Sequence, residues 1–219
     1  MRVLVCIVSH EMNSRDITNI QILDKYMKES GNTVEYAGIS SKDDFSEFED
    51  VIQFKYKFIC LDKQLTKICK FIDKFRSSFN YDWYVKIRPD IRLLQQIDFS
   101  VLNPKAINAR AREYEGPNVI KYGISIPHGR IQSRPFRYHI IKKRVILDDQ
   151  IYMFHHTVIN KFDVRLLFSS IEVEWQHTAY WNLLNIPLNI IGINVLFTKY
   201  NWTSGDLGSK GKFLFGLQK

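Results

Sequence analysis

The feature that most constrains the fold is a run of six apolar residues, VLVCIV, at positions 3–8. A short continuous apolar run that ends abruptly in polar residues is typical of a strand buried on both faces of a parallel sheet. Residues 16–29 then carry apolar side chains at helical spacing up to Gly31, and residues 33–39 form a second apolar segment. This order predicts a β-α-β unit with a right-handed crossover, and therefore an α/β fold.

The rest of the chain continues the alternation of strands and helices. We expect strands at 51–54, 81–87 and 187–197, and helices at 62–79, 156–168 and 172–184. The segment 103–143 is rich in proline and glycine and predicts short strands joined by long loops. A chain of 219 residues can bury one sizeable core, so we expect one domain with a central, mostly parallel sheet flanked by helices.

Composition restricts the class of protein further. Hydrophobic residues make up 45% of the chain and aromatic residues 14%, which excludes a disordered or fibrous protein. The three cysteines are odd in number and form no C-x-x-C pair, so the sequence predicts a reducing compartment. The first apolar run is too short for a signal peptide, and no apolar run approaches the length of about 18 residues that spans a membrane. We therefore expect a cytoplasmic protein, either free or peripheral to a membrane.

The net charge of +8 is concentrated in one segment. Residues 105–144 hold ten Lys or Arg residues against two Glu residues. Such a segment attracts anionic ligands, whether a diphosphate, a nucleic acid or an acidic lipid surface. The alternative interpretation is an ordinary solvated surface loop.

The stretch YDWYVKIRPDI, residues 81–91, is the strongest candidate for a functional site. Lys86 and Arg88 alternate onto one face of the predicted strand, and Pro89 ends the strand just before Asp90. Open α/β sheets bind ligands at the carboxyl ends of their strands. One or two carboxylates with phosphate oxygens are a common ligand set for Mg²⁺ or Mn²⁺, and neighbouring cations can neutralise the rest of a diphosphate. An ordinary ion pair at the strand end is the alternative.

This stretch resembles the tyrosine-aspartate, apolar strand and Arg-x-Asp signature of small GT-A-type glycosyltransferases found in bacterial surface-polysaccharide and large-virus gene sets. Further segments of the chain match the family in the family's order. They are a polar turn after the first strand, the pair Asp149-Gln150, a late helix led by Glu172 or Glu174, and an Asn-Ile-Pro-Leu turn into a strand. The resemblance covers most of the chain. It implies a GT-A-like (Rossmann-like) domain over 1–219, with a nucleotide-binding half at 1–100 and an acceptor-side half at 101–219.

The resemblance also implies a donor site for a nucleotide-diphosphate sugar. Asp90 matches the last aspartate of the family's Asp-x-Asp motif, which holds a divalent cation, Mn²⁺ or Mg²⁺, on the nucleotide phosphates. Arg88 stands where the first aspartate would be, and an arginine can neutralise phosphate by bidentate contacts. The residues expected to bind the donor are Ser9, His10, Arg15, Lys86, Arg88 and Asp90.

The pair Asp148-Asp149 is the candidate for catalysis, with Asp149 favoured. An inverting transfer needs a carboxylate to take the proton from the acceptor hydroxyl, here of a glycan or glycoprotein. The alternative is that Asp149 caps a helix beginning at Gln150, and a retaining mechanism stays open.

Two rival functions remain in the sequence. The charge and interleaved aromatic residues also suit a nucleic-acid-binding or nucleic-acid-processing protein, but no Glu-x-Lys or Asp-x-Lys triplet follows the Pro89-Asp90 pair to complete a nuclease-like signature. A catalytically silent nucleotide-sugar-binding domain would also explain the incomplete Asp-x-Asp motif. The turn SHEMNSR after the first strand lacks Gly-x-Gly, which disfavours a dehydrogenase or a methyltransferase.

Overall fold

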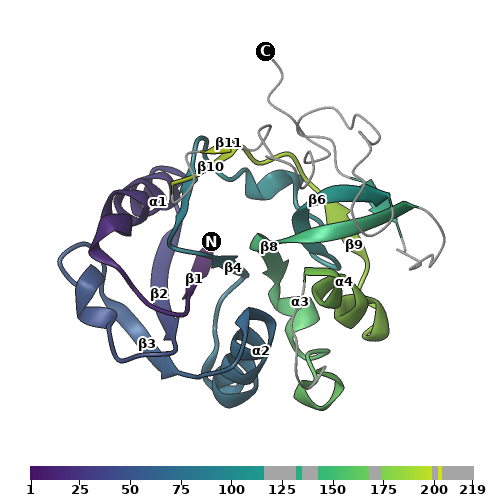
Figure 1. Ribbon diagram of the computed structural model, residues 1–219, viewed down its shortest axis with the longest axis horizontal. Coiled ribbons are helices and arrows are strands. Elements are labelled where there is room, and N and C mark those ends of the chain that lie inside the picture. Colours follow the sequence, from purple (N-terminus) through teal and green to yellow (C-terminus); the bar gives the residue numbers. More distant parts are fainter. Residues whose placement is uncertain (116–131, 135–142, 168–173, 199–201, 204–219) are drawn as a thin grey trace.

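The computed structural model describes residues 1–115, 132–134, 143–167, 174–198 and 202–203, and these form two sheets with helices packed against them (Figure 1). The larger sheet has the strand order β3-β2-β1-β4-β8-β6-β9-β7. In chain order these strands are β1 (Arg2–Val8), β2 (Thr33–Ser40), β3 (Phe54–Ile59), β4 (Trp83–Ile87), β6 (Ile107–Glu115), β7 (Gln132–Arg134), β8 (Lys143–His155) and β9 (Leu188–Ile190). The smaller sheet has the order β11-β10-β5, from β5 (Ile91–Leu93), β10 (Val195–Phe197) and β11 (Trp202–Thr203).

The described helices are few and short. They are α1 (Ile17–Glu29), α2 (Gln64–Phe75), α3 (His156–Ile159) and α4 (Glu174–Leu183), with 3-10 turns at Ser14–Asp16, Phe45–Phe48, Arg76–Ser78, Phe99–Val101 and Val164–Leu166. Over the described part of the chain, no helix is long and apolar enough to cross a membrane.

The larger sheet is mostly parallel. Strand β1 pairs in parallel with β2 and β4, β2 with β3, and β6 with β9. Strands β8 and β7 run against their neighbours. The predicted fold class is therefore confirmed: the chain is an α/β protein with a Rossmann-like, mostly parallel central sheet flanked by helices.

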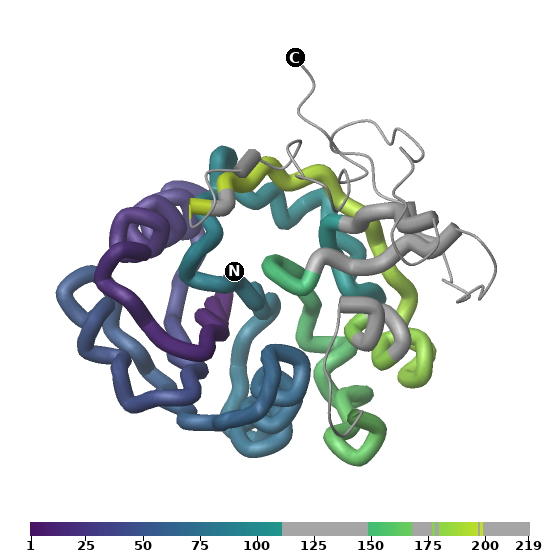
Figure 2. Tube along the Cα trace, in the orientation of Figure 1, coloured from purple at the N-terminus to yellow at the C-terminus, as the bar shows by residue number. Residues whose placement is uncertain are grey.

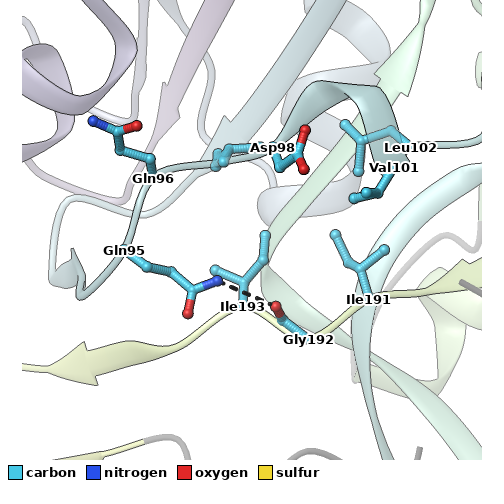
Figure 3. A pocket seen from close by; sticks show the side chains of 9 residues that line it. Gln95, Gln96, Asp98, Val101, Leu102, Ile191, Gly192 and Ile193 are labelled. Atoms are coloured by element: carbon cyan, nitrogen blue, oxygen red, sulfur yellow. Dashed lines mark hydrogen bonds between the residues drawn. The ribbon is translucent and has the colours of Figure 1, made fainter. Parts of the chain in front are cut away.

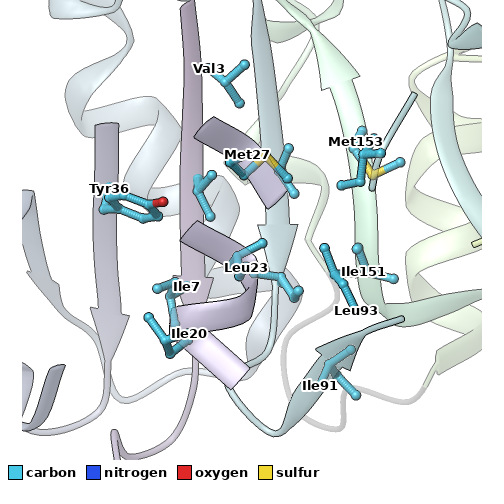
Figure 4. Close-up of a cluster of buried hydrophobic side chains, with 14 of the residues drawn as sticks. Val3, Ile7, Ile20, Leu23, Met27, Tyr36, Ile91, Leu93, Ile151 and Met153 are labelled. Carbon is cyan, nitrogen blue, oxygen red and sulfur yellow. The ribbon is translucent and has the colours of Figure 1, made fainter. Parts of the chain in front are cut away.

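Strand β1 is buried on both faces, as its apolar run predicts. Its odd-numbered residues, such as Ile7, pack under α1 against Ile20, Leu23 and Met27 (Figure 4). Its even-numbered residues belong to a second cluster, which α2 and α4 cover from the other face. These two layers explain why the strand has no polar side chain from Val3 to Val8.

Close packing also explains one glycine in the sheet. A Cβ atom added to Gly38 in β2 would lie 2.6 Å from Cδ1 of the buried Phe45. Glycine therefore lets the 3-10 turn Phe45–Phe48 lie directly on the sheet.

Several predicted elements differ from the observed ones. The strand predicted at 51–54 begins at Phe54 and runs to Ile59, and the helix predicted at 156–168 is only the four-residue α3. The single strand predicted at 187–197 is two strands, β9 and β10, which belong to different sheets. Most of the segment 103–143 lies outside the described residues, but it contributes β6, an interior strand that sequence patterning did not locate.

Candidate functional site

The order in which the chain adds strands to the sheet reverses at β1, so the switch point of the sheet lies at β1 and β4. The chain runs from β1 through α1 to β2 and β3, then returns through α2 to β4 on the other side of β1 (Figures 1 and 2). Because β1 and β4 are parallel, their carboxyl ends meet at one edge of the sheet. In open α/β sheets this switch point is where ligands bind.

A polar cavity of about 260 Å³ lies at this switch point. It combines the turn after β1, the turn after β4 and the first residue of α2. Its lining residues are Val8, Ser9, His10, Glu11, Arg15, Asp16, Gln64, Arg88, Pro89 and Asp90. Five of the six residues expected to bind the donor thus line one cavity, although they come from two distant segments of the chain.

Arg88 and Asp90 form a forked ion pair on the cavity wall. The Nε atom of Arg88 donates to Oδ1 of Asp90 at 2.8 Å, and Nη2 donates to Oδ2 at 2.5 Å. The Asp90 side chain is 9% exposed, whereas that of Arg88 is 26% exposed. The carboxylate is therefore largely enclosed by the guanidinium, and the guanidinium is the more accessible of the two groups.

The turn that carries Asp90 is held by a buried asparagine of α1. Asn19 donates through Nδ2 to the main-chain oxygen of Pro89 and to Oγ1 of Thr198, both at 2.9 Å, and its Oδ1 accepts from Nε of Arg92 at 3.0 Å. The main-chain N–H of Thr198 donates to the main-chain oxygen of Asp90 at 3.1 Å. Our sequence reasoning missed Asn19, although a polar residue beside Ile20 on the apolar stripe of a helix was a signal for such a role.

The turn after β1 presents Arg15 to the cavity. The main-chain N–H of Arg15 donates to Oδ1 of Asn13 at 3.1 Å, which fixes the start of the 3-10 turn Ser14–Asp16. The Arg15 side chain is 54% exposed, and its Nε lies 3.7 Å from Oδ1 of Asp16, too far for a strong ion pair. About half of the Arg15 side chain is therefore accessible to an anion in the cavity.

Two buried lysines lie behind the cavity wall. Lys67 donates to the main-chain oxygen of Ser9 and, at 2.7 Å, to Oγ of Ser41. Lys86 donates to Oε1 of Gln64 at 2.5 Å and to a main-chain oxygen of β8. Both ammonium groups are buried, and each contacts a residue that lines the cavity. Lys86 therefore lies behind Gln64 rather than on the cavity surface, and it adds positive potential from there.

The N-terminus of α2 adds to the same potential. The helix begins at Gln64, which lines the cavity, and Lys63 before it forms no side-chain capping hydrogen bond. A helix N-terminus carries a partial positive charge and N–H groups without helical partners.

The two candidate catalytic acids lie within β8. The oxygen that accepts from Lys86 is the main-chain oxygen of Asp149, and the main-chain N–H of Arg88 donates to the oxygen of Gln150 at 3.0 Å. The helix-capping alternative for Asp149 is wrong, because Asp149 lies inside the strand β8, which runs through Gln150 to His155, and no helix begins at Gln150. Asp149 is half-buried beside the end of β4 but does not line the cavity. The side chain of Asp148 lies outside the described part of the chain.

The basic segment 105–144 is not a single surface patch. Arg110 is buried, because β6 lies inside the sheet between β8 and β9. Lys105 is exposed. The other basic side chains of the segment lie outside the described residues.

The described residues do not fit the divalent cation expected on Asp90. Within the described ranges, no group of three His, Cys, Asp or Glu side chains could hold a metal ion. Both oxygens of Asp90 are hydrogen-bonded to Arg88, so an ion on the remaining lone pairs of Asp90 would lie beside a guanidinium that repels it.

A second cavity, of about 210 Å³, has a different character. It is lined by residues 95–98, 101–102 and 191–193, and Gln95 donates to the main-chain oxygen of Gly192 across it at 3.4 Å (Figure 3). Asp98 is the only ionisable residue in this lining. The cavity therefore lacks the cluster of charged groups found at the switch point.

These features define the class of protein: a Rossmann-like α/β protein with a cavity lined by charged residues at the switch point of its sheet. No family model matches the sequence, and no curated protein matches it. Among solved structures, the chain is similar to the crystal structure of A197 from STIV, with a TM-score of 0.51, 11% sequence identity and 93% of each chain covered. At this identity the likeness shows the fold alone.

Proposed function

We propose that the chain is a glycosyltransferase that binds a nucleotide-diphosphate sugar at the switch-point cavity and transfers the sugar to a hydroxyl group of a glycan or glycoprotein. One observation carries the proposal. Residues of two distant segments that resemble the donor-binding motifs of GT-A-type glycosyltransferases line the same polar cavity. The fold is compatible with that family. The position of the cavity at the carboxyl ends of β1 and β4 suits a nucleotide ligand.

The charges around the cavity favour a diphosphate. Arg15 and Arg88 line it, Lys67 and Lys86 lie directly behind it, and α2 directs its N-terminus toward it. Arginine donates in a planar fork that matches phosphate oxygens. The same cations would stabilise the negative charge that develops on the diphosphate as it leaves the sugar.

Asp149 is the proposed general base. The acceptor hydroxyl oxygen attacks the anomeric carbon and forms the new glycosidic bond, while the bond from that carbon to the diphosphate oxygen breaks. Asp149 takes the hydroxyl proton, and the nucleoside diphosphate leaves with the bonding electrons. Its place on β8, next to the strand end that carries Arg88, would put the base beside the donor.

The test is turnover of nucleotide sugars by the full chain. UDP-, GDP- and TDP-sugars are incubated with the protein, and release of nucleoside diphosphate is measured with and without glycan acceptors. Arg88→Ala is expected to lower turnover by about 10- to 100-fold, the equivalent of one charge-assisted hydrogen bond. Arg165→Ala is the matched control, because Arg165 is 85% exposed and does not line the cavity. Equal loss in both variants, or full activity of Arg88→Ala, would contradict the proposal.

A catalytically silent nucleotide-sugar-binding domain is the second candidate. The arginine at position 88, where the resembled motif has an aspartate, favours it. Saturable binding of a nucleotide sugar without turnover, even with acceptors present, would support this candidate. Salt-sensitive binding of DNA or RNA, with no nucleotide-sugar binding, would instead support the nucleic-acid class.

A further inference from the structure

We infer that the donor diphosphate is held without a divalent metal ion, with the guanidinium of Arg88, oriented by Asp90, in the place that a metal would take. This inference rests on the proposed function and specifies how its donor site works. It also assigns Asp90 as a positioning residue for Arg88 rather than a metal ligand.

Each acidic side chain that lines the cavity faces a cation of the protein. Asp90 is held by Arg88 in the fork described above. Glu11 pairs with Lys42 at 2.7 Å, and Oδ1 of Asp16 lies 3.7 Å from Nε of Arg15. A divalent ion needs oxygen ligands whose negative charge it can neutralise. At this cavity the protein's own cations already face those carboxylates.

Two buried lysines add cations close to the same wall. The Lys67 ammonium contacts oxygen atoms of Ser9 and Ser41. The Lys86 ammonium contacts the amide oxygen of Gln64. With Arg15 and Arg88 they place cations on several sides of the cavity, an arrangement that suits an anionic ligand.

The geometry of the fork suits Arg88 for direct phosphate binding. A carboxylate that engages Nε and Nη2 fixes the plane of the guanidinium, and a fixed plane loses less entropy when it binds an anion. Arg88 remains the more exposed partner of the pair and lines the cavity. The main-chain oxygen of Asp90 accepts a hydrogen bond from Thr198, which follows β10, and that of Pro89 accepts one from Asn19 of α1. These bonds hold the turn that carries Asp90, and through Asp90 they help to fix the Arg88 side chain.

The experiment is isothermal titration of the full chain with uridine, guanosine and thymidine diphosphates, in excess EDTA and in excess MnCl₂. The best ligand is expected to bind equally well in both, within about twofold. Arg88→Ala should weaken binding in EDTA by about 10- to 100-fold, the range of a charge-assisted hydrogen bond. Arg88→Lys should fall in between, because an ammonium group keeps the charge but cannot form the fork.

Asp90 variants separate a positioning residue from a metal ligand. Asp90→Asn keeps an acceptor oxygen for Arg88, so its affinity should lie between those of the wild type and Asp90→Ala, with no response to MnCl₂. Thermal unfolding of each variant checks that it is folded, and Arg165→Ala again serves as the control.

The outcomes are distinguishable. Binding that appears only with MnCl₂ or MgCl₂ overturns the metal-free site and leaves the proposed function standing. Binding in EDTA that Arg88→Ala does not weaken also overturns the inference. Binding of no nucleoside diphosphate under either condition overturns the proposed function itself.

Discussion

Replacing Asn19 by alanine should destabilise the protein and the donor site together. Asn19 is a buried residue of α1 whose side chain forms three hydrogen bonds, to Pro89, Thr198 and Arg92. These bonds join α1 to the turn that carries Asp90 and to the end of β10.

The magnitude follows from the number of bonds lost. A hydrogen bond in a protein contributes about 0.5–1.5 kcal/mol, and a buried polar group left without its partner costs about 1–3 kcal/mol. Alanine regains up to about 0.7 kcal/mol through its higher helix propensity. The net loss of unfolding free energy should therefore be about 2–3 kcal/mol, which lowers the melting temperature of a domain of this size by about 5–10 °C.

The assay compares thermal unfolding of Asn19→Ala with that of Asn32→Ala. Asn32 is half-buried near the other end of α1 and forms one long bond, from Nδ2 to the main-chain oxygen of Met27 at 3.4 Å. The control should lose less than about 1 kcal/mol. Nucleoside diphosphate affinity should fall in Asn19→Ala and stay unchanged in Asn32→Ala. Equal melting temperatures for wild type and Asn19→Ala, within about 1 °C, would refute the reasoning.

Three further predictions test other parts of the structure. Gly38→Ala should lower the urea midpoint by the equivalent of about 1–3 kcal/mol, because its Cβ would overlap Phe45; an unchanged midpoint would contradict this packing. Hydrogen bonds from Arg165 hold the pKa of Asp163 at about 2, below its ordinary 3.8. The stability that this lowered pKa provides is present above pH 3.8 and is lost as the pH falls through about 2. The melting temperature of Asp163→Asn should therefore depend less on pH over that range than the melting temperature of the wild type. Parallel plots of melting temperature against pH for the two proteins would contradict this prediction. Asp149→Asn should leave nucleoside diphosphate affinity intact and lower sugar transfer by about 10²- to 10⁴-fold, and unaltered transfer would exclude it as the base.

The central part of the fold was predictable because burial shapes its sequence directly. The run at residues 3–8 is apolar at every position since helices cover both faces of β1, and the helical spacing in 16–29 follows from the one buried face of α1. The same logic placed Asp90 at the carboxyl end of a strand, and the structure brings it to the switch-point cavity.

The longest described strand was missed for an equally physical reason. Asp148, Asp149 and Gln150 interrupt the apolar pattern of β8, so local propensity disfavours a strand there. The ladder with β6 is irregular at these three residues, but β8 pairs with β6 on both sides of them and with β4 from Ile151 to His155, which overrides that preference. Strand pairing between distant segments leaves no periodic signal in a single sequence.

Side-chain bonds between elements were also beyond sequence patterning. Spacing alone did not indicate that Lys67 reaches Ser9 or that Lys86 reaches Gln64, whereas an ion pair at the strand end, which Arg88 and Asp90 form, was the alternative that the sequence offered to a metal site. These bonds depend on how α2 and the two turns meet at one edge of the sheet. They are the basis of our inference that Arg88 takes the place of the predicted metal ion.

A crystal structure with a bound nucleoside diphosphate, grown without divalent metal ions, tests the central claim most directly. We expect the diphosphate in the switch-point cavity, with its oxygens within hydrogen-bonding distance of the Arg88 guanidinium and close to the turn that carries Arg15. A diphosphate bound elsewhere, for example in the cavity between Gln95 and Ile193, would contradict it.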